Sequence, residues 1–246
     1  MNSKLSRKSS NYLAIAMMVI VIVPSMMPIV LGLSQLGRIR ALPIIDWGAT
    51  LFHGTVVSVI ATLVGGWIAI DVRYSSRAPW RRLTIWFLLT ALFPLPLLAQ
   101  CFSLLLRLTG GTGREALLII GHTLAMCPIA FVLVFRRALL DPEEYFLVLR
   151  NFGCSPSMAI KVLGYTRYRK EVMLSAGLIF FASINESVMT GVLGGSTAYF
   201  GSVMNNLALG SADLAAFGVG MIVEILPVMA FLYVVSVRSS IRRSSF

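Results

Sequence analysis

The sequence predicts an all-α, polytopic membrane protein with six transmembrane helices, both termini in the cytoplasm, and a short helical loop between the fourth and fifth spans. Three observations predict this class. Hydrophobic residues make up 57% of the 246 residues, six apolar windows are long enough to cross about 30 Å of hydrocarbon, and Lys and Arg are distributed unequally between the connecting segments. Continuous apolar runs are also unlike the alternating strands of a membrane β-barrel.

The expected spans follow one another along the chain with short connections. Their approximate limits are residues 12–33, 51–70, 83–104, 116–135, 173–194 and 214–235. The first four contain no charged residue, whereas the last two each contain one carboxylate, Glu186 and Glu224. The first run follows a basic start but is longer than the apolar core of a signal peptide, so we expect it to be a retained helix.

The basic residues orient these spans. With the N-terminus inside, only Arg38, Arg40, Arg107 and Arg114 of the 21 Lys and Arg residues fall on the outer side. This is the bias that the positive-inside rule requires. The net charge of +11 is therefore interpreted as a topology signal and as contact with the anionic lipid bilayer, rather than as a sign of nucleic-acid binding.

The loop at residues 141–170 has its own predicted structure. Four apolar side chains, Tyr145, Val148, Leu149 and Phe152, recur at the spacing of one helix face. We expect this helix to begin near Asp141 as N-cap, with Pro142 in the first turn, and to end at Gly153 in a left-handed conformation.

A second short helix follows the glycine. Ser155 and Pro156 form an expected N-cap and first turn, and an apolar face precedes the expected stop at Gly164; this face contains Met158, Ala159, Val162 and Leu163. One interpretation is a docking surface for another protein. The alternative is an amphipathic segment that floats its apolar face in the lipid.

The segment Leu149 to Leu163, read as L-R-N-F-G-C-S-P-S-M-A-I-K-V-L, resembles the coupling loop of binding-protein-dependent ABC importer permeases, which have the MetI-like fold. Gly153 occupies the glycine position of that family's EAA-type signature and Leu163 its aliphatic position, and Cys154, Ser155 and Pro156 match the residues that commonly follow the glycine. The sequence departs from the signature in two places. Leu147, Val148 and Leu149 stand in the E-A-A positions, and Tyr165 with Thr166 replaces Leu-Pro.

The resemblance implies a permease subunit in the bacterial cytoplasmic (inner) membrane. Residues 51–235 would be its core, residues 1–50 an added tail, span and periplasmic loop, and residues 236–246 a basic tail. Two ABC ATPase subunits, which bind ATP and Mg, would dock on the loop; the implied coupling residues are Tyr145, Val148, Leu149, Phe152, Gly153, Ser155, Pro156, Ala159 and Leu163. A second permease copy or a paralogue, and a periplasmic or lipid-anchored solute-binding protein, would complete the importer.

The sequence contains no Gly-Lys pair and therefore no P-loop, so we expect this chain to be a transport subunit and not an enzyme. Its three cysteines lack metal-ligand spacing. His53 and His122 lie in different spans and are expected to be packed helix residues that form no recognisable set with the carboxylates.

Polar residues within the spans are expensive to bury and need an explanation. Asn185, Glu186 and Glu224 could line the translocation path or its gate. Alternatively, Glu186 could brace neighbouring helices with Asn185 as its partner. A secondary transporter that uses Glu186 and Glu224 as ion sites is the competing function, although no inverted repeat is visible in the sequence.

Overall fold

The computed structural model describes residues 30, 44–74, 94–142, 144–209, 219–220, 222–223 and 225–231. Every regular element in these residues is a helix, which confirms the all-α class for this part of the chain. The chain divides into two compact units. One unit is Ile45–Val203, and the other joins Met1–Ile44 to Met204–Phe246. In the second unit, Gly220 lies against the side chain of Met204.

Two long helices dominate the unit Ile45–Val203. Helix α2 covers Trp47–Tyr74 and helix α5 covers Arg114–Leu140. At 1.5 Å per residue each is roughly 40 Å long, and both are apolar enough to cross a membrane. Two apolar helices could therefore span a membrane, and both extend beyond the spans expected at residues 51–70 and 116–135. The six-span topology remains a prediction.

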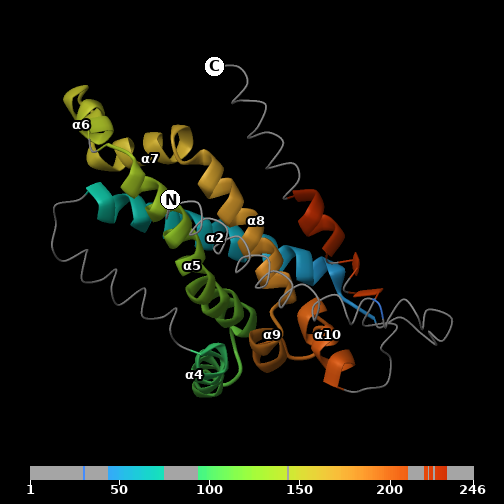
Figure 1. Cartoon of the computed structure of the whole chain (residues 1–246). Helices are drawn as coiled ribbons and strands as arrows, with labels where there is room; N and C mark the ends of the chain where they lie inside the picture. The colour runs from blue at the N-terminus through green and yellow to red at the C-terminus, as the bar shows by residue number, and fades with distance from the viewer. Residues whose placement is uncertain are drawn as a thin grey trace, which may run out of the picture. The chain divides into compact units, whose positions relative to one another are not determined.

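Small residues allow α2 and α5 to approach closely. Gly65 of α2 lies directly against the backbone carbonyl of Cys127 and the methyl group of Ala130, so that any side chain at this position would collide with α5. Small residues at helix contacts are typical of membrane bundles. Helix α8, Arg169–Asn185, packs on both long helices (Figure 1), and Ile179 joins the buried cluster between them.

The span expected at residues 173–194 is not one continuous helix. Helix α8 ends at Asn185, Glu186 has extended backbone (φ −69°, ψ 121°), and a separate helix α9 covers Val188–Leu193. Helix α4, Leu95–Leu108, packs against α9 through Phe102 and Leu106. The remainder of the third expected span, residues 83–93, and the whole of the first, apart from residue 30, lie outside the described residues.

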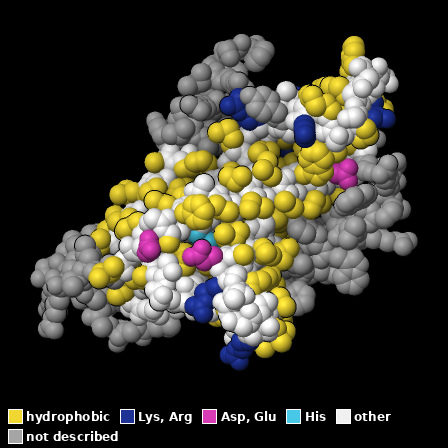
Figure 2. Space-filling view, turned by 180° about the vertical axis from the view of Figure 1, so that it is seen from behind, with side chains coloured by type: hydrophobic (Ala, Val, Ile, Leu, Met, Phe, Trp, Pro, Cys, Tyr) yellow, Lys and Arg dark blue, Asp and Glu magenta, His cyan; other side chains and the backbone are white. Residues whose placement is uncertain are grey.

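The short helices of the loop occupy one end of α5 and α8. Helices α6, Glu144–Asn151, and α7, Pro156–Thr166, lie there, whereas α4 and α9 lie at the other end (Figure 1). Apolar side chains cover most of the middle of the face in Figure 2, and Lys and Arg gather toward its two ends. This pattern is consistent with an apolar belt between two water-facing ends.

Candidate functional site

The glycine between α6 and α7 has the conformation that the sequence predicts. Gly153 has φ +83°, in the left-handed region that favours glycine. Its N–H donates to the carbonyl of Arg150 at 3.0 Å, and the next N–H, of Cys154, donates to Leu149 at 3.1 Å. These two bonds form a Schellman motif, which satisfies the last carbonyls of α6.

The start of α7 is also confirmed. The hydroxyl of Ser155 accepts a hydrogen bond from the N–H of Met158 at 3.3 Å, and Pro156 is the first helical residue. The helix does not stop at Gly164, however, and continues to Thr166. A Cβ at Gly164 would lie 3.6 Å from the side chain of Ile70 on α2, an ordinary van der Waals distance, so alanine would also fit at this position.

The apolar side chains of the loop divide into an exposed group and a buried group. Tyr145 and Val148 of α6 are 44% and 48% exposed, and Phe152, in the turn that follows α6, is 83% exposed. Leu149 is half-buried against the core, whereas Ala159 and Leu163 of α7 are buried. Ala159 and Leu163 therefore belong to the packed side of the loop, and the exposed apolar surface belongs to α6 and to the turn that follows it.

Asp141 does not cap α6, which begins only at Glu144. Its carboxylate is buried and accepts two hydrogen bonds from the guanidinium of Arg167, at 3.0 and 3.1 Å, with Arg137 3.3 Å away. A paired charge is worth more to a buried carboxylate than a local cap. Asp141 therefore ties the first residue of the loop to its last turn.

Aromatic contacts fix the loop to α2. The Arg167 guanidinium lies 4.9 Å from the centre of the Tyr145 ring, and Phe146 stacks on Tyr74 at 5.0 Å. The hydroxyl groups of Tyr74 and Tyr168 share a hydrogen bond of 2.7 Å. Burial, together with this bond, raises the pKa of Tyr168, so its hydroxyl keeps its proton. These contacts make the loop a rigid attachment to α2.

Replacing Asp141 by Asn is expected to loosen this attachment. The change removes the charge that pairs with Arg137 and Arg167 while keeping the size of the side chain. Because both arginines are partly exposed, we expect a loss of about 2 kcal/mol and a decrease in apparent Tm of roughly 4–8 °C. Thermal unfolding in detergent measures the shift, and cleavage by trypsin at the exposed Arg150 should become faster.

The control for this variant is Glu144→Gln, which removes an exposed carboxylate from the same loop. It should leave both measurements unchanged. Equal apparent Tm values for Asp141→Asn and Glu144→Gln would contradict the anchoring role of Asp141.

The structure brings together three polar side chains, two from separate helices and one from the break between α8 and α9. His53 of α2 and His122 of α5 share a contact of 2.5 Å between Nε2 and Nδ1, and the other nitrogen of His122, Nε2, is 2.6 Å from Oε2 of Glu186. Both histidines and the Glu186 side chain are buried. We call this the His53–His122–Glu186 chain; the expectation that the histidines form no set with a carboxylate was wrong.

Glu186 also holds the break between α8 and α9. Its two carboxylate oxygens accept hydrogen bonds from the backbone N–H groups of Val188, Met189 and Thr190, at 2.6–3.3 Å. The predicted pairing with Asn185 is wrong, because the Asn185 amide donates to the carbonyl of Phe181 in its own helix at 2.8 Å. The contacts of Glu186 are those of a brace with His122 as its partner, and its place on a translocation path stays a prediction. Glu224 lies outside the described residues.

The hydrogen-bond chain has a defined direction at its carboxylate end. The carboxylate of Glu186 only accepts, so Nε2 of His122 carries the hydrogen. In the neutral His122 ring Nδ1 is then the acceptor, so Nε2 of His53 donates in the contact between the two rings. The three groups are arranged in line rather than around one point, and in the described residues no cluster of three or more ligand-type side chains could hold a metal ion.

His53 connects this chain to a hollow of about 270 Å³, which Glu115 and Tyr199 also line. Comparison of the chain with models of protein families and with curated proteins finds no match.

Proposed function

We propose that this chain is the transmembrane permease subunit of an ATP-driven, binding-protein-dependent importer in a bacterial cytoplasmic membrane. It would have six transmembrane helices with both termini inside, and it would form half of the translocation path. The observation that carries the proposal is the glycine-hinged pair α6 and α7, which lies at one end of two apolar helices and presents Tyr145, Val148 and Phe152 outward.

The construction of the loop suits a lever. Its beginning and end are joined by Asp141 and Arg167, and Tyr168 and Phe146 attach it to Tyr74 of α2. A force on α6 would therefore reach α2, and through the close α2–α5 contact at Gly65 it would reach α5. Rigid elements of this kind can move as bodies between two states.

The chemistry of the exposed surface indicates how an ATPase subunit would bind. The exposed apolar side chains of Tyr145 and Val148 on α6, with Phe152 in the turn after it, match the pattern of a helix that lies in an apolar groove of its partner. Such binding would not need the acidic residue that the family signature places before the glycine. ATP and Mg would be bound by the partner ATPases, and a second permease and a solute-binding protein would complete the assembly.

Crosslinking tests this docking directly. Phe152 and Leu108 are each 83% exposed. Phe152 directly follows α6 and Leu108 ends α4, and these two helices lie at opposite ends of the unit Ile45–Val203 (Figure 1). In a background without Cys101, Cys127 and Cys154, the Phe152→Cys variant should crosslink to an ATPase subunit that co-purifies with the chain. The Leu108→Cys variant is the matched control and should not crosslink to it. Crosslinks from Phe152→Cys to lipid alone would favour the floating helix.

The His53–His122–Glu186 chain is the one observation that favours a secondary transporter. A buried line of imidazole and carboxylate groups could pass a proton between the hollow beside His53 and the centre of the bundle. Against this, every oxygen of the Glu186 carboxylate is already bonded to α9 or to His122. The importer is therefore the better-supported proposal.

A further inference from the structure

The hollow beside His53 lies near the first turns of α2 and α5, at the end of their unit that is away from the loop (Figure 1). Its volume is about 270 Å³, just below the range of drug-sized ligand sites, so any occupant lies near every wall. Phe52, Glu115 and Tyr199 line it together with His53. The rings of His53 and Tyr199 meet edge to face, with their centres 5.6 Å apart. The hollow therefore places one small molecule between aromatic rings and a carboxylate.

The direction of the His53–His122–Glu186 chain determines what His53 offers to this hollow. Because the Glu186 carboxylate only accepts, His122 donates to it through Nε2, and Nδ1 of His122 accepts from Nε2 of His53. A neutral His53 then carries no hydrogen on Nδ1, which is an acceptor. No described residue pairs with this nitrogen, so Nδ1 is the hydrogen-bonding group that His53 offers to the hollow it lines.

The hollow also carries negative charge at its edge. Glu115 is exposed and forms no ion pair with a described cation. Tyr199 is 5% exposed, and burial, with the charges of Glu115 and Asp46, raises the pKa of its hydroxyl, which therefore keeps its proton. No Lys or Arg lines the hollow, and Arg114 lies against Gly195 instead. In Figure 2, histidine atoms are visible beside acidic side chains on an otherwise apolar face. The surroundings of the hollow thus favour a cation.

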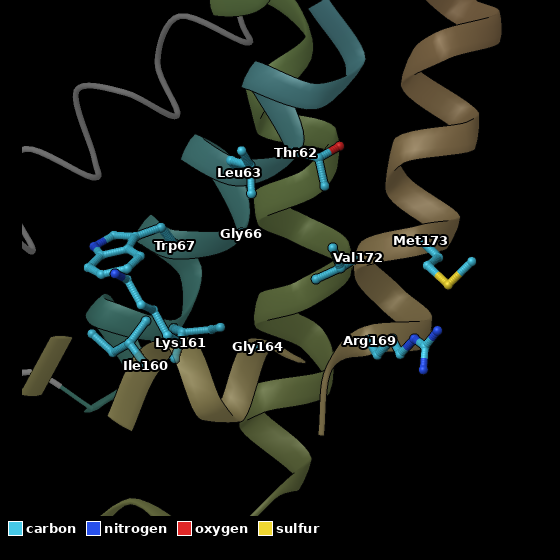
Figure 3. A pocket seen from close by; sticks show the side chains of 11 residues that line it. Thr62, Leu63, Gly66, Trp67, Ile160, Lys161, Gly164, Arg169, Val172 and Met173 are labelled. Atoms are coloured by element: carbon cyan, nitrogen blue, oxygen red, sulfur yellow. The ribbon is translucent and has the colours of Figure 1, made fainter. Parts of the chain in front are cut away.

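The larger hollow of the same unit, between α2, α7 and α8, is different in kind (Figure 3). Its volume is about 490 Å³, and its walls are mostly apolar, with Leu63, Trp67 and Met173 among them. The charged side chains that line it are basic, Lys161 and Arg169, and none is acidic. A cation would be repelled there, so of these two hollows the one beside His53 is suited to a cation.

We propose that the hollow beside His53 binds a small organic cation of the primary ammonium class. An N–H of the ammonium group would donate to Nδ1 of His53, and Glu115 would attract its positive charge. Its alkyl chain would lie against the rings of Phe52 and Tyr199. A neutral alcohol could use the acceptor but would leave the charge of Glu115 without a partner. For a metal ion, the described residues offer no cluster of three or more ligand-type side chains.

Matched ligands test the site on the purified full-length chain in a neutral detergent. Butylammonium, butyltrimethylammonium and butanol have the same alkyl chain, but the second lacks an N–H donor and the third lacks a charge. Saturation-transfer NMR titrations at neutral pH measure the Kd of each. We expect butylammonium to bind on the order of tenfold more tightly than butyltrimethylammonium, because a hydrogen bond from a charged donor contributes about this much. It should bind about fivefold more tightly than butanol.

Charge removal tests the role of Glu115. The Glu115→Gln variant should weaken the binding of both cationic ligands about threefold to fivefold. Butanol binding should stay unchanged, which shows that the hollow is intact. The control Glu144→Gln removes an exposed carboxylate of α6 that does not line the hollow and should bind all three ligands as the wild type does.

A change outside the hollow tests the acceptor on His53. In Glu186→Gln the amide donates to Nε2 of His122, and Nδ1 of His122 then donates to Nε2 of His53, so the chain is reversed. His53 would then carry its hydrogen on Nδ1 and would offer a donor to the hollow. The preference for butylammonium over butyltrimethylammonium should fall to near one, whereas the Kd of butyltrimethylammonium should not change.

Four results would overturn the proposal. Equal affinities for the two cations in the wild type would mean that no N–H donor is recognised, and a preference that survives Glu186→Gln would place the acceptor elsewhere. Equal effects of Glu115→Gln and Glu144→Gln would mean only general attraction to surface charge. Absence of saturable binding would mean that the hollow takes no ligand of this class. Because the assay involves neither ATPase nor transport, its outcome is independent of whether the chain is an importer subunit.

Discussion

Gly153→Val is expected to abolish ATP-dependent uptake while the chain still accumulates in the membrane. At φ +83° a β-branched residue is strained by roughly 2 kcal/mol. A Cβ at this position would meet no atom within 4 Å, so the effect is a property of the backbone and not of a collision. A strain of this size would lower the equilibrium ratio of docking-competent to other loop conformations about thirtyfold, and uptake measurements in reconstituted vesicles would detect the change.

Two controls separate the hinge from general strain. Gly153→Asn keeps a residue that tolerates the left-handed conformation and should retain most of the uptake. Gly111→Val introduces the same strain at a glycine that also has φ +83° and open surroundings, but in the turn between α4 and α5. The Gly111→Val variant should lower the apparent Tm by a similar amount but retain ATP-dependent uptake. Undiminished uptake by Gly153→Val, with normal co-purification of the ATPase, would refute the role of the loop.

Local chemistry explains which parts of the site could be predicted from the sequence. The left-handed stop at Gly153 and the cap at Ser155 are each determined by residues within a few positions of one another. A Schellman motif and an N-cap depend on hydrogen bonds of this short range. Both predictions are therefore confirmed, because neither depends on contacts with residues outside the loop.

The predictions that were wrong share a different physical origin. Asp141 has the local signals of an N-cap, but its partner Arg167 is 26 residues away. Gly164 has the signal of a helix stop, but α7 continues through it to Thr166, since a glycine inside a helix costs only about 1 kcal/mol. For Asp141 a tertiary ion pair outweighs a local cap that is worth about 1 kcal/mol.

The His53–His122–Glu186 chain was missed for the same reason. Its members are separated by 69 and 64 positions in the sequence, and no motif links them. The available signal was weaker: all three are polar residues within apolar runs, where each needs a partner. Three such residues in one bundle can serve as partners for one another, and this possibility is the signal in the sequence that indicates the His53–His122–Glu186 chain.

Glu186→Ala is expected to destabilise the protein more than any other single change considered. It leaves the N–H groups of Val188 and Met189 and the buried Nε2 of His122 without an acceptor. Removing one partner of a buried pair costs about 3 kcal/mol or more, and unsatisfied donors add to this. We expect a decrease in apparent Tm of roughly 6–12 °C and reduced accumulation in the membrane.

Glu186→Gln distinguishes a brace from a gate. The Gln carbonyl can still accept from Val188 and Met189, and the amide in the place of Oε2 can donate to Nε2 of His122, which then donates through Nδ1 to His53. Every member of the chain keeps a partner, and only the 3.3 Å bond from Thr190 loses its acceptor. We therefore expect an apparent Tm close to that of the wild type and near-normal uptake at every pH tested. A variant that folds normally but does not transport would show instead that the charge or proton of Glu186 takes part in translocation. The hydrogen bonds of Glu186 to α9 and His122 would then serve transport, because a carboxylate that takes part in translocation needs the same partners between transport cycles.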